Sequence, residues 1–409
     1  MNIVHINFSD TYGGASIAAF RHHQAINKSQ FAKSTMLVID KQTQDKDVFC
    51  FAKGLRKFIQ KIFFLKLGNI ITKICSPKIY FSFLFAGFDL SQNKIIQNAD
   101  IIIIHWINPM TTSIYQVKKI LKLNKPTYLF LHDMWYLTGG CHYSLECNMY
   151  QSNCGQCNKI KVPYLAKLQF KEKENWNKYS NLNILTPSTW LYNCTQKSKL
   201  FHDTPKYICR NLIDTQIFIP KNKNLCKKTL GLSLNKKTIA FIATSIKNPV
   251  KGLNILLKSL SQLSEQEYEC LIIGSYNSKI KENIPLKTIF TGYIKDESKL
   301  VNIYNAADFL IIPSIAENFP NVILEAMACG IPVIGFNIGG IPDLIQHKIN
   351  GYISMNPNSE GLIEGIQWCS KKDYYDNLSI NARESIVTKY SYENITNIYN
   401  FININKQNA

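Results

Sequence analysis

Two glutamates, Glu317 and Glu325, are separated by seven residues in a stretch that reads as strand, loop, helix and strand. The apolar run 307–312 has the length of a buried strand, and residues 320–329 have the pattern of a helix that begins at a proline and ends before Gly330. Glu317 then lies in the loop at the carboxyl end of the strand, and Glu325 can point back to the same edge of the sheet. Open α/β sheets bind ligands at this edge, so the pair predicts a ligand site.

A simpler explanation of the two glutamates stays open, because acidic residues near helix N-termini stabilise the helix dipole. Residues 322–324 and 326–328, around Glu325, are apolar, and a buried carboxylate needs partners such as ligand hydroxyls. The free N–H groups of Asn321 and Val322 at the helix start offer a site for an anion such as phosphate. The paired spacing therefore favours a ligand site over dipole stabilisation alone.

The motif P-S-x-x-E-x-F-P-x-x-x-x-E-A-M-A-x-G-x-P-V, at residues 313–333, resembles the retaining family-four glycosyltransferases of GT-B fold. The similarity covers nearly the whole chain and is strongest over residues 238–360. It implies an α/β protein of two Rossmann-like doubly wound domains that face each other across a cleft, and a nucleotide-sugar donor. It also implies that Glu317 contacts the donor sugar and that Glu325 contacts the ribose.

The resemblance implies further donor contacts in three loops. A strand–Gly-Gly–helix unit near the N-terminus lets backbone approach a ligand closely, although paired glycines often only close a tight turn. In the family this loop lies near the donor phosphates and the acceptor, a second turn wraps the sugar and phosphate, and a third segment holds the base through backbone groups. The matching residues here are Gly13 and Gly14, then Asn318, Phe319, Pro320 and Asn321, and then Tyr293 and Ile294.

A basic pair grips the donor pyrophosphate in the resembled family, and only half of it is evident here. Lys251, which precedes Gly252 after the strand 238–243, matches the second member of the pair. The position of the usual arginine holds Ser245. Lys247 is the nearest substitute, although a lysine does not reproduce the bidentate geometry of arginine. The alternative for Lys251 is that it is one of many surface lysines.

A polar pair, His132-Asp133, follows the predicted buried strand 126–131 at the edge where sheet ligands bind. A lone histidine is more often structural than catalytic. The resemblance implies that His132 contacts the donor sugar, and His105, which also ends a predicted strand, is the alternative. With Glu317 and Lys251 this predicts a catalytic set of three residues that needs no protein nucleophile and no cofactor for catalysis.

Four cysteines occur within seventeen residues in the pattern C-x5-C-x6-C-x2-C. Their number and type suit a tetrahedral structural zinc ion, which would order the segment after His132. The alternatives are four buried thiols or a redox pair, and His142 could replace one ligand. A similar cluster occurs in a narrower subgroup that resembles exopolysaccharide, O-antigen and colanic-acid transferases, and this likeness covers residues 128–160. The cysteines are Cys141, Cys147, Cys154 and Cys157.

The length of 409 residues and the hydrophobic content of 46% suffice for two domains with full cores. We expect an N-terminal acceptor-side domain over 1–215, to which the helical tail 381–409 crosses back. A nucleotide-sugar-binding domain is expected over 216–380. The polar, lysine-rich residues 220–237 are expected to form the linker.

The chain shows no run of 18 uninterrupted apolar residues and starts directly in a predicted strand, so we expect a cytoplasmic protein. In that compartment its twelve cysteines are expected to be thiols or metal ligands. The net charge of +19 would suit nucleic acid, anionic lipid or phosphorylated substrates. No nucleic-acid-binding motif is present, so lipid and phosphate are favoured. Residues 53–90 interleave lysines with large apolar side chains, which suits either an anionic membrane surface or an insertion packed on the N-terminal domain.

The resemblance therefore implies a retaining, nucleotide-sugar-dependent hexosyltransferase. Its acceptor would be a saccharide, expected to be a growing lipid-linked cell-surface polysaccharide such as exopolysaccharide or lipopolysaccharide, on the inner face of the membrane. A GT-B epimerase or phosphorylase is the alternative, since it would share the donor site. A non-enzymatic nucleic-acid-binding protein is suggested only by the charge.

Overall fold

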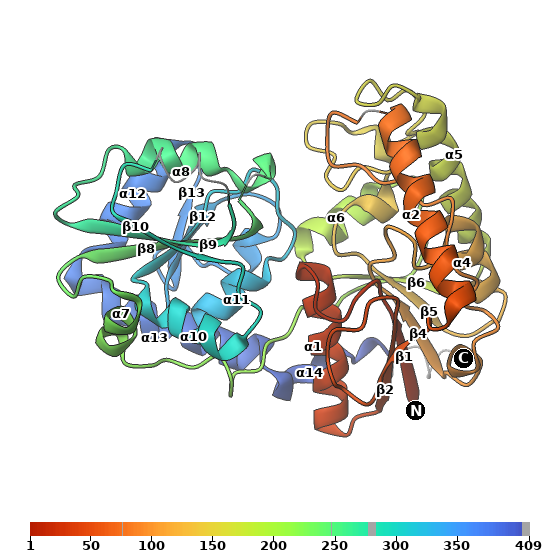
Figure 1. Cartoon of the computed structure of the whole chain (residues 1–409), viewed down its shortest axis with the longest axis horizontal. Coiled ribbons are helices and arrows are strands. Elements are labelled where there is room, and N and C mark those ends of the chain that lie inside the picture. Colours follow the sequence, from red (N-terminus) through yellow and green to blue (C-terminus); the bar gives the residue numbers. More distant parts are fainter. Residues whose placement is uncertain (76, 247, 277–283, 403–409) are drawn as a thin grey trace. The chain divides into compact units, whose positions relative to one another are not determined.

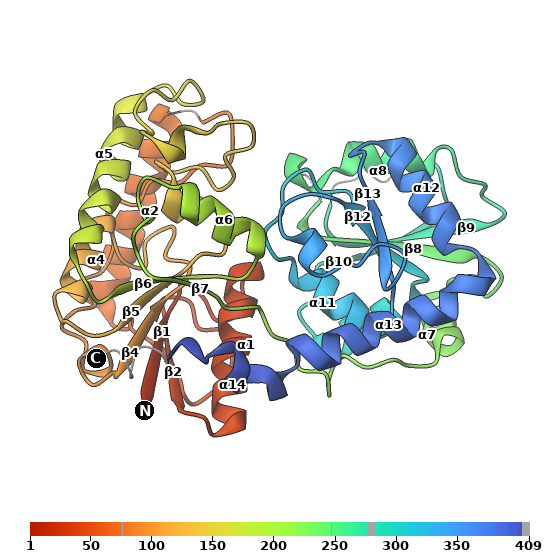
Figure 2. The same cartoon turned by 180° about the vertical axis from the view of Figure 1, so that it is seen from behind.

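The computed structural model describes residues 1–75, 77–246, 248–276 and 284–402, which form two α/β units (Figures 1 and 2). Internal contacts assign Met1–Asn211 to the first unit, together with the described residues from Ile395 onward. Leu212–Asn394 form the second unit. Each unit has its own hydrophobic core.

The first unit is built on a parallel sheet of seven strands in the order β3-β2-β1-β4-β5-β6-β7. Short apolar runs such as Ile101–Ile104 are buried on both faces, as expected for strands covered by helices on each side. The chain reverses direction across the sheet between β1 and β4, which creates a topological switch point. The strands are β1 (Asn2–Ile6), β2 (Lys33–Val38), β3 (Val48–Cys50), β4 (Ile101–Ile104), β5 (Thr127–Phe130), β6 (Leu182–Thr186) and β7 (Lys206–Ile208).

Helices cover both faces of this sheet. Figures 1 and 2 show α2, α4 and α5 on one face and α1 on the other, where α14 packs against α1. Serine caps fix two helix starts, because Ser113 and Ser188 accept backbone N–H hydrogen bonds at the first turns of α4 and α6. The helices are α1 (Gly14–Ser29), α2 (Leu55–Cys75), α3 (Lys94–Gln97), α4 (Ile114–Leu121), α5 (Pro163–Glu174), α6 (Thr189–Lys197) and α14 (Ile395–Ile398), with 3-10 turns at Trp135–Leu137, Met149–Gln151 and Asn175–Lys178.

Residues near the end of the chain contribute to the core of the first unit. The ring of Phe401 lies 5.2 Å from that of Tyr128 on β5 and 5.3 Å from that of Tyr207 on β7. Tyr399 is also buried, with its ring 5.6 Å from His22 on α1. The long helix that precedes this tail, α13 (Lys372–Tyr390), belongs to the second unit.

The second unit has a parallel sheet of six strands in the order β10-β9-β8-β11-β12-β13, with its switch point between β8 and β11. In Figures 1 and 2, α8 and α12 lie on one face, and α7, α10, α11 and α13 lie on the other. The expected α/β class with two doubly wound sheets is therefore confirmed. The strands are β8 (Lys237–Ser245), β9 (Tyr268–Ser275), β10 (Thr288–Gly292), β11 (Phe309–Ile312), β12 (Val333–Phe336) and β13 (Gly351–Ser354). The remaining elements are α7 (Lys223–Leu230), α8 (Leu253–Leu260), α10 (Glu297–Ala306), α11 (Asn321–Ala328) and α12 (Ser359–Cys369), with 3-10 turns at Pro249–Lys251, Ile341–Asp343 and Tyr392–Asn394.

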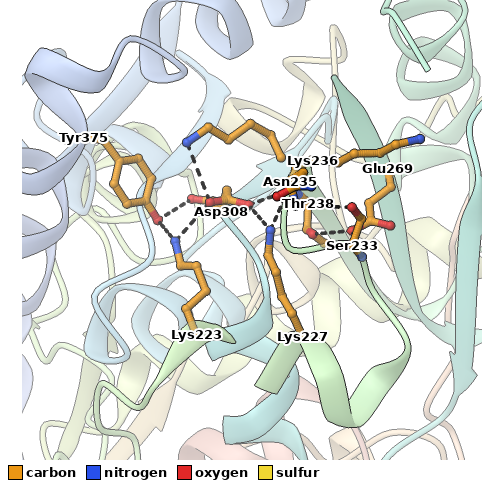
Figure 3. Close-up of polar contacts among 10 residues, drawn as sticks. Lys223, Lys227, Ser233, Asn235, Lys236, Thr238, Glu269, Asp308 and Tyr375 are labelled. Atoms are coloured by element: carbon orange, nitrogen blue, oxygen red, sulfur yellow. Dashed lines mark hydrogen bonds and ion pairs between the residues drawn. The ribbon is translucent and has the colours of Figure 1, made fainter. Parts of the chain in front are cut away.

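The prediction that residues 220–237 form a linker is wrong, because this stretch contains α7, which packs against α10 inside the second unit. Buried Asp308, just before β11, binds Nζ of Lys227 at 2.8 Å and Nζ of Lys223 at 3.1 Å. It also accepts a hydrogen bond from the N–H of Thr238 at 2.8 Å (Figure 3). The Asp308 carboxylate therefore offsets the charge of these α7 lysines. The polar composition of the stretch had led us to expect an exposed linker.

Asp308→Asn should lower the free energy of unfolding at pH 7 by about 3 kcal/mol, because it removes the negative charge that buried Lys227 faces. Burial alone would raise the pKa of Asp308, but Lys223 and Lys227 together with the Thr238 N–H hold it below its usual value. The charged carboxylate therefore stabilises the fold above the unfolded-state pKa of about 3.9, and this contribution is lost as the pH falls through the lower folded-state pKa.

Urea denaturation of wild type and Asp308→Asn at pH 7 and in strongly acidic buffer measures this contribution, and the difference between the two should shrink in acid. Asp203→Asn is the matched control, since Asp203 is an exposed aspartate. The interpretation fails if the two variants lose the same stability at pH 7.

Candidate active site

The switch point of the second unit brings together two residues that the sequence singled out. Lys251 ends the 3-10 turn after β8, and Glu317 lies in the loop after β11, the neighbouring strand. Ligands of open α/β sheets bind outside the carboxyl ends of strands at such a point. The two residues meet directly, because Nζ of Lys251 forms an ion pair with Oε1 of Glu317.

The Glu317 carboxylate is held from two sides. Ser314 Oγ donates a hydrogen bond of 3.0 Å to the same Oε1 that Lys251 contacts. The Glu317 side chain is 7% exposed and that of Lys251 is 31% exposed. The pair thus combines a positioned carboxylate with a cation that reaches solvent. Charged groups fixed in this way are suited to stabilising charge that develops on a bound phosphate or sugar.

Two glycines allow the backbone around this pair to pack closely. Gly252 has φ +71, and a Cβ atom there would lie 1.8 Å from the carbonyl oxygen of Pro313. Gly339 has φ +57, and its Cβ would lie 1.8 Å from the carbonyl oxygen of Glu317. Both need glycine for conformation and for space. The loops that carry Lys251 and Glu317 are therefore positioned by main-chain contacts as well as by their ion pair.

The turn after Glu317 leads into α11, which begins at Asn321 with Pro320 as its N-cap residue. The helix begins one residue later than the sequence predicted. Asn318 and Asn321 are both buried, and the ring of Phe319 packs edge-on against Tyr390 at 5.7 Å. The N-terminus of α11 thus lies at the end of the loop that carries Glu317, and helix N-termini attract anions.

Glu325 lies within α11 and is 4% exposed. Tyr304 on α10 donates a 2.6 Å hydrogen bond from its hydroxyl to Oε2 of Glu325. The sequence did not identify Tyr304, because a tyrosine in a helix that packs on the core looks like any other core aromatic. The structure therefore provides a protein partner for the Glu325 carboxylate.

The other predicted donor residues of the second unit lie elsewhere on the sheet. Tyr293 and Ile294 follow β10, the edge strand, and are separated from β11 by β9 and β8 in the strand order. Ile294 packs against the core, and Tyr293 is exposed. Lys247, the predicted substitute for the missing arginine, lies outside the described residues.

In the first unit, three of the predicted residues lie at the carboxyl ends of strands. Gly13, with φ +86, caps α1, and Gly14 begins it, so the glycine turn closes the loop from β1 to α1. His132 follows β5, and His105 follows β4. The sequence treated these two histidines as alternatives. Instead they contact each other, since Nδ1 of His105 lies 2.9 Å from Nε2 of His132.

The segment after His132 is ordered by hydrogen bonds that no sequence pattern indicated. Nδ1 of His142 lies 2.8 Å from the Asp133 carboxylate, and its Nε2 lies 2.8 Å from Ser82 Oγ. The indole N–H of Trp135 donates to the carbonyl oxygen of Ser82 at 3.0 Å. His142 is therefore a buried link between two segments of the chain, 79–85 and 133–142.

Two side chains of α5 hold the same segment. Buried Lys173 donates a 3.0 Å hydrogen bond from Nζ to the carbonyl oxygen of Thr138 and a second hydrogen bond to that of Trp135. Gln169 donates to the carbonyl oxygen of Gly139 at 2.9 Å. The four cysteines led us to expect that a zinc ion would order this segment. Buried polar groups of α5 order it here.

The four clustered cysteines are free thiols, each partly exposed. Burial, followed by the proximity of Cys157, Cys154 and Cys147, raises the pKa of Cys141 to about 12, so its thiol stays protonated. Within the described part of the chain, no three His, Cys, Asp or Glu side chains are arranged to hold a metal ion. The four thiols are near neighbours, since each of the other three contributes to the raised pKa of Cys141.

Zinc binding by these cysteines stays a prediction that metal analysis tests. Protein purified without chelator is expected to carry one zinc per chain and to protect four thiols from titration, because thiolate ligands are deprotonated and shielded when metal is bound. Cys154→Ser should release that metal. Substoichiometric zinc together with four freely titrating thiols would leave the cluster as ordinary cysteines.

The family model described as "Glycosyl transferases group 1" matches residues 223–385, which lie within the second unit. Among similar proteins is the N-acetyl-alpha-D-glucosaminyl L-malate synthase of Bacillus anthracis, 27% identical over 201 residues. The match covers 47% of this chain and 51% of that relative, so the chain spans about half the length of the relative it resembles.

Solved structures resemble the chain over its whole length. The sucrose-phosphate synthase of Thermosynechococcus elongatus has a TM-score of 0.68 at 14% identity and covers 100% of this chain and 98% of its own. The Anabaena HepE structure in complex with UDP-glucose has a TM-score of 0.66 at 15% identity and covers 98% and 99%. At these identities the likeness shows the fold. The chain therefore has the GT-B fold, and its residues 223–385 match the group 1 glycosyltransferase family model.

Proposed function

We propose that this protein is a retaining glycosyltransferase that moves a sugar from a nucleotide-sugar donor to a saccharide acceptor. The observation that carries the proposal is the Lys251–Glu317 ion pair at the switch point of the second unit, next to the N-terminus of α11. A cation and the N-terminal end of a helix suit the donor phosphates, and a buried carboxylate suits the sugar hydroxyls. The matched glycosyltransferase domain includes all of these residues.

The proposed reaction needs no protein nucleophile. The acceptor hydroxyl attacks the anomeric carbon on the face from which the nucleotide phosphate leaves, and the departing phosphate takes the acceptor proton. Lys251 and the first N–H groups of α11 stabilise the negative charge on that phosphate. Glu317 orients the sugar, Glu325 binds the ribose, and His132 contacts the sugar.

Incubation with a panel of nucleotide sugars and no acceptor tests the donor half of this function. We expect slow release of free sugar from one nucleotide sugar, with the anomeric configuration retained in the first product seen by NMR. An epimerised nucleotide sugar, or a sugar phosphate formed from added phosphate, would identify the epimerase or phosphorylase alternative. A chain that binds no nucleotide sugar would contradict the proposal.

The proposed acceptor is a growing, lipid-linked cell-surface saccharide, reached by the protein at the inner face of the membrane. The support is α2, on which eight large apolar side chains are exposed alongside lysines. Phe64 anchors the helix to the first unit through a ring contact of 5.4 Å with Phe88. Over the described residues, no helix is long and apolar enough to cross a membrane. The exposed apolar residues are Leu55, Phe58, Ile59, Ile62, Phe63, Leu65, Ile70 and Ile74.

Sedimentation with lipid vesicles should show binding to anionic but not to neutral bilayers, weakened by salt, because exposed lysines contribute about 1 kcal/mol each near an anionic surface. The double change Lys66→Glu/Lys73→Glu on α2 should lower the partition coefficient at least about tenfold. Lys371→Glu/Lys372→Glu, on exposed residues of the second unit, makes the same change of charge elsewhere. Equal partitioning of wild type to neutral and anionic vesicles would rule out this role of residues 53–90.

A further inference from the structure

Three histidines at three neighbouring strands form a continuous series in the first unit, in which His132 is partly exposed. Nδ1 of His5 lies 2.8 Å from Nε2 of His105, and Nδ1 of His105 lies 2.9 Å from Nε2 of His132. The strands β1, β4 and β5 are adjacent in the sheet, so the series runs across the switch point. His5 and His105 are fully buried.

The series is held rigidly. The His5 and His105 rings stack at 5.1 Å, the His105 and His132 rings stack at 5.2 Å, and Phe130 stacks on His132 at 4.7 Å. The hydroxyl of Tyr136 donates to the carbonyl oxygen of His105 at 2.6 Å. None of these rings can turn without losing contacts on both sides, so the nitrogens that face each other stay paired.

Each imidazole in the series is neutral. Burial lowers the pKa of His132 to about 3 and lowers those of His5 and His105 well below the ordinary value. A neutral imidazole has one N–H donor and one acceptor nitrogen, so a series of them must run in a single direction. Either every ring donates toward His132, or every ring donates toward His5.

The inner end of the series decides the direction. Nε2 of His5 is buried and has no hydrogen-bond partner among the described residues. If the rings donated toward His5, this atom would be a buried N–H without an acceptor, which is rarer in proteins than an unsatisfied acceptor. The favoured direction is from Nδ1–H of His5 to His105, and from Nδ1–H of His105 to Nε2 of His132.

From this geometry we infer that His5 and His105 are positioning residues that commit Nε2 of His132 as an acceptor and place its single proton on Nδ1. His132 then meets its ligand as a hydrogen-bond donor through Nδ1–H, toward a hydroxyl oxygen of the donor sugar. The contact with the donor sugar rests on the role proposed for His132 above. The tautomer itself is a property of the first unit and does not depend on that role.

Nitrogen NMR of the whole chain, labelled with ¹⁵N-histidine, tests the tautomer without substrate. In wild type, His132 should show a protonated Nδ1 and an unprotonated Nε2. His105→Phe keeps an aromatic ring but removes the donor, so His132 should become a mixture of tautomers. His105→Asn restores an N–H donor close to the position of Nδ1 and should restore the wild-type signals.

Kinetics test the consequence for transfer. His105→Phe should lower kcat by about tenfold with a smaller change in KM, as expected when one hydrogen bond is misdirected in the transition state, and His105→Asn should recover most of the loss. His22→Phe is the matched control. His22 is also buried, but neither of its ring nitrogens has a hydrogen-bond partner among the described residues, so kcat should change less than twofold.

The outcomes separate this inference from the proposed function. An unchanged His132 tautomer in His105→Phe, or a wild-type tautomer with the proton on Nε2, would overturn the inference whatever the enzyme does. If the tautomer of His132 shifts as expected but no form of the protein transfers sugar, the inference about the histidine series stands and the proposed function is contradicted. If His105→Phe and His22→Phe lowered kcat equally, the loss would come from disturbed core packing, and the positioning role of His105 would be overturned.

Discussion

Glu317→Gln should lower kcat for sugar transfer by about 10²–10³-fold while leaving the unfolding temperature close to that of wild type. The amide keeps the size of the side chain and can still accept the hydrogen bond from Ser314. It removes the charge that Lys251 faces and that would orient the sugar in the transition state, and interactions made only in the transition state act on kcat. Steady-state kinetics with the donor identified by the nucleotide-sugar panel measure the effect.

A matched control is available in the same unit. Glu360 pairs with Lys258 at 3.2 Å, but both side chains are exposed, so Glu360→Gln changes an ion pair of the same type away from the site. Its kcat should stay within twofold of wild type. Wild-type turnover in Glu317→Gln would move the catalytic site away from the switch point.

Gly252→Ala should cost both stability and activity. The left-handed conformation at φ +71 costs an alanine about 1–3 kcal/mol, and the new Cβ would lie 1.8 Å from the carbonyl oxygen of Pro313. Relief of that clash must move the turn that ends in Lys251, the loop that leads to Glu317, or both. We therefore expect a loss of thermal stability together with a loss of transfer of at least about tenfold, since small displacements of catalytic groups are costly.

Gly231→Ala separates backbone strain from the clash. Gly231 has φ +72, nearly the same conformation, but a Cβ atom there would meet nothing within 4 Å. This variant should lose stability through strain alone and keep wild-type kcat. Indistinguishable stability and activity in the two variants would mean that the contact between Gly252 and Pro313 is unimportant.

The sequence predicted the architecture because local patterns suffice for it. Short apolar runs separated by helical patterns define a parallel sheet, and the position of Glu317 after one such run places it at the ligand edge. The direct contact of Lys251 with Glu317 could not be read from the sequence, since 65 residues separate them along the chain. It follows only from the pairing of β8 with β11.

The features that the sequence missed all depend on contacts between distant segments. Composition made the lysines of α7 look exposed because Asp308 lies far away in the chain. His105 looked like an alternative to His132 because the hydrogen bond between them requires β4 and β5 to be adjacent. Likewise, the sequence did not indicate that Gln169 and Lys173 hold the segment after His132, because α5 follows that segment only later in the chain.

The return of the chain from α13 to the first unit limits how the protein can be dissected. A fragment that ends at residue 211 would lack Tyr399 and Phe401, and the aromatic surfaces of Tyr128 and Tyr207 would face water. A fragment of residues 212–394 keeps its own sheet and helices complete. Separate study of the two units is therefore straightforward for the second, whereas the first requires residues 395–402 to be fused after residue 211 or supplied as a peptide.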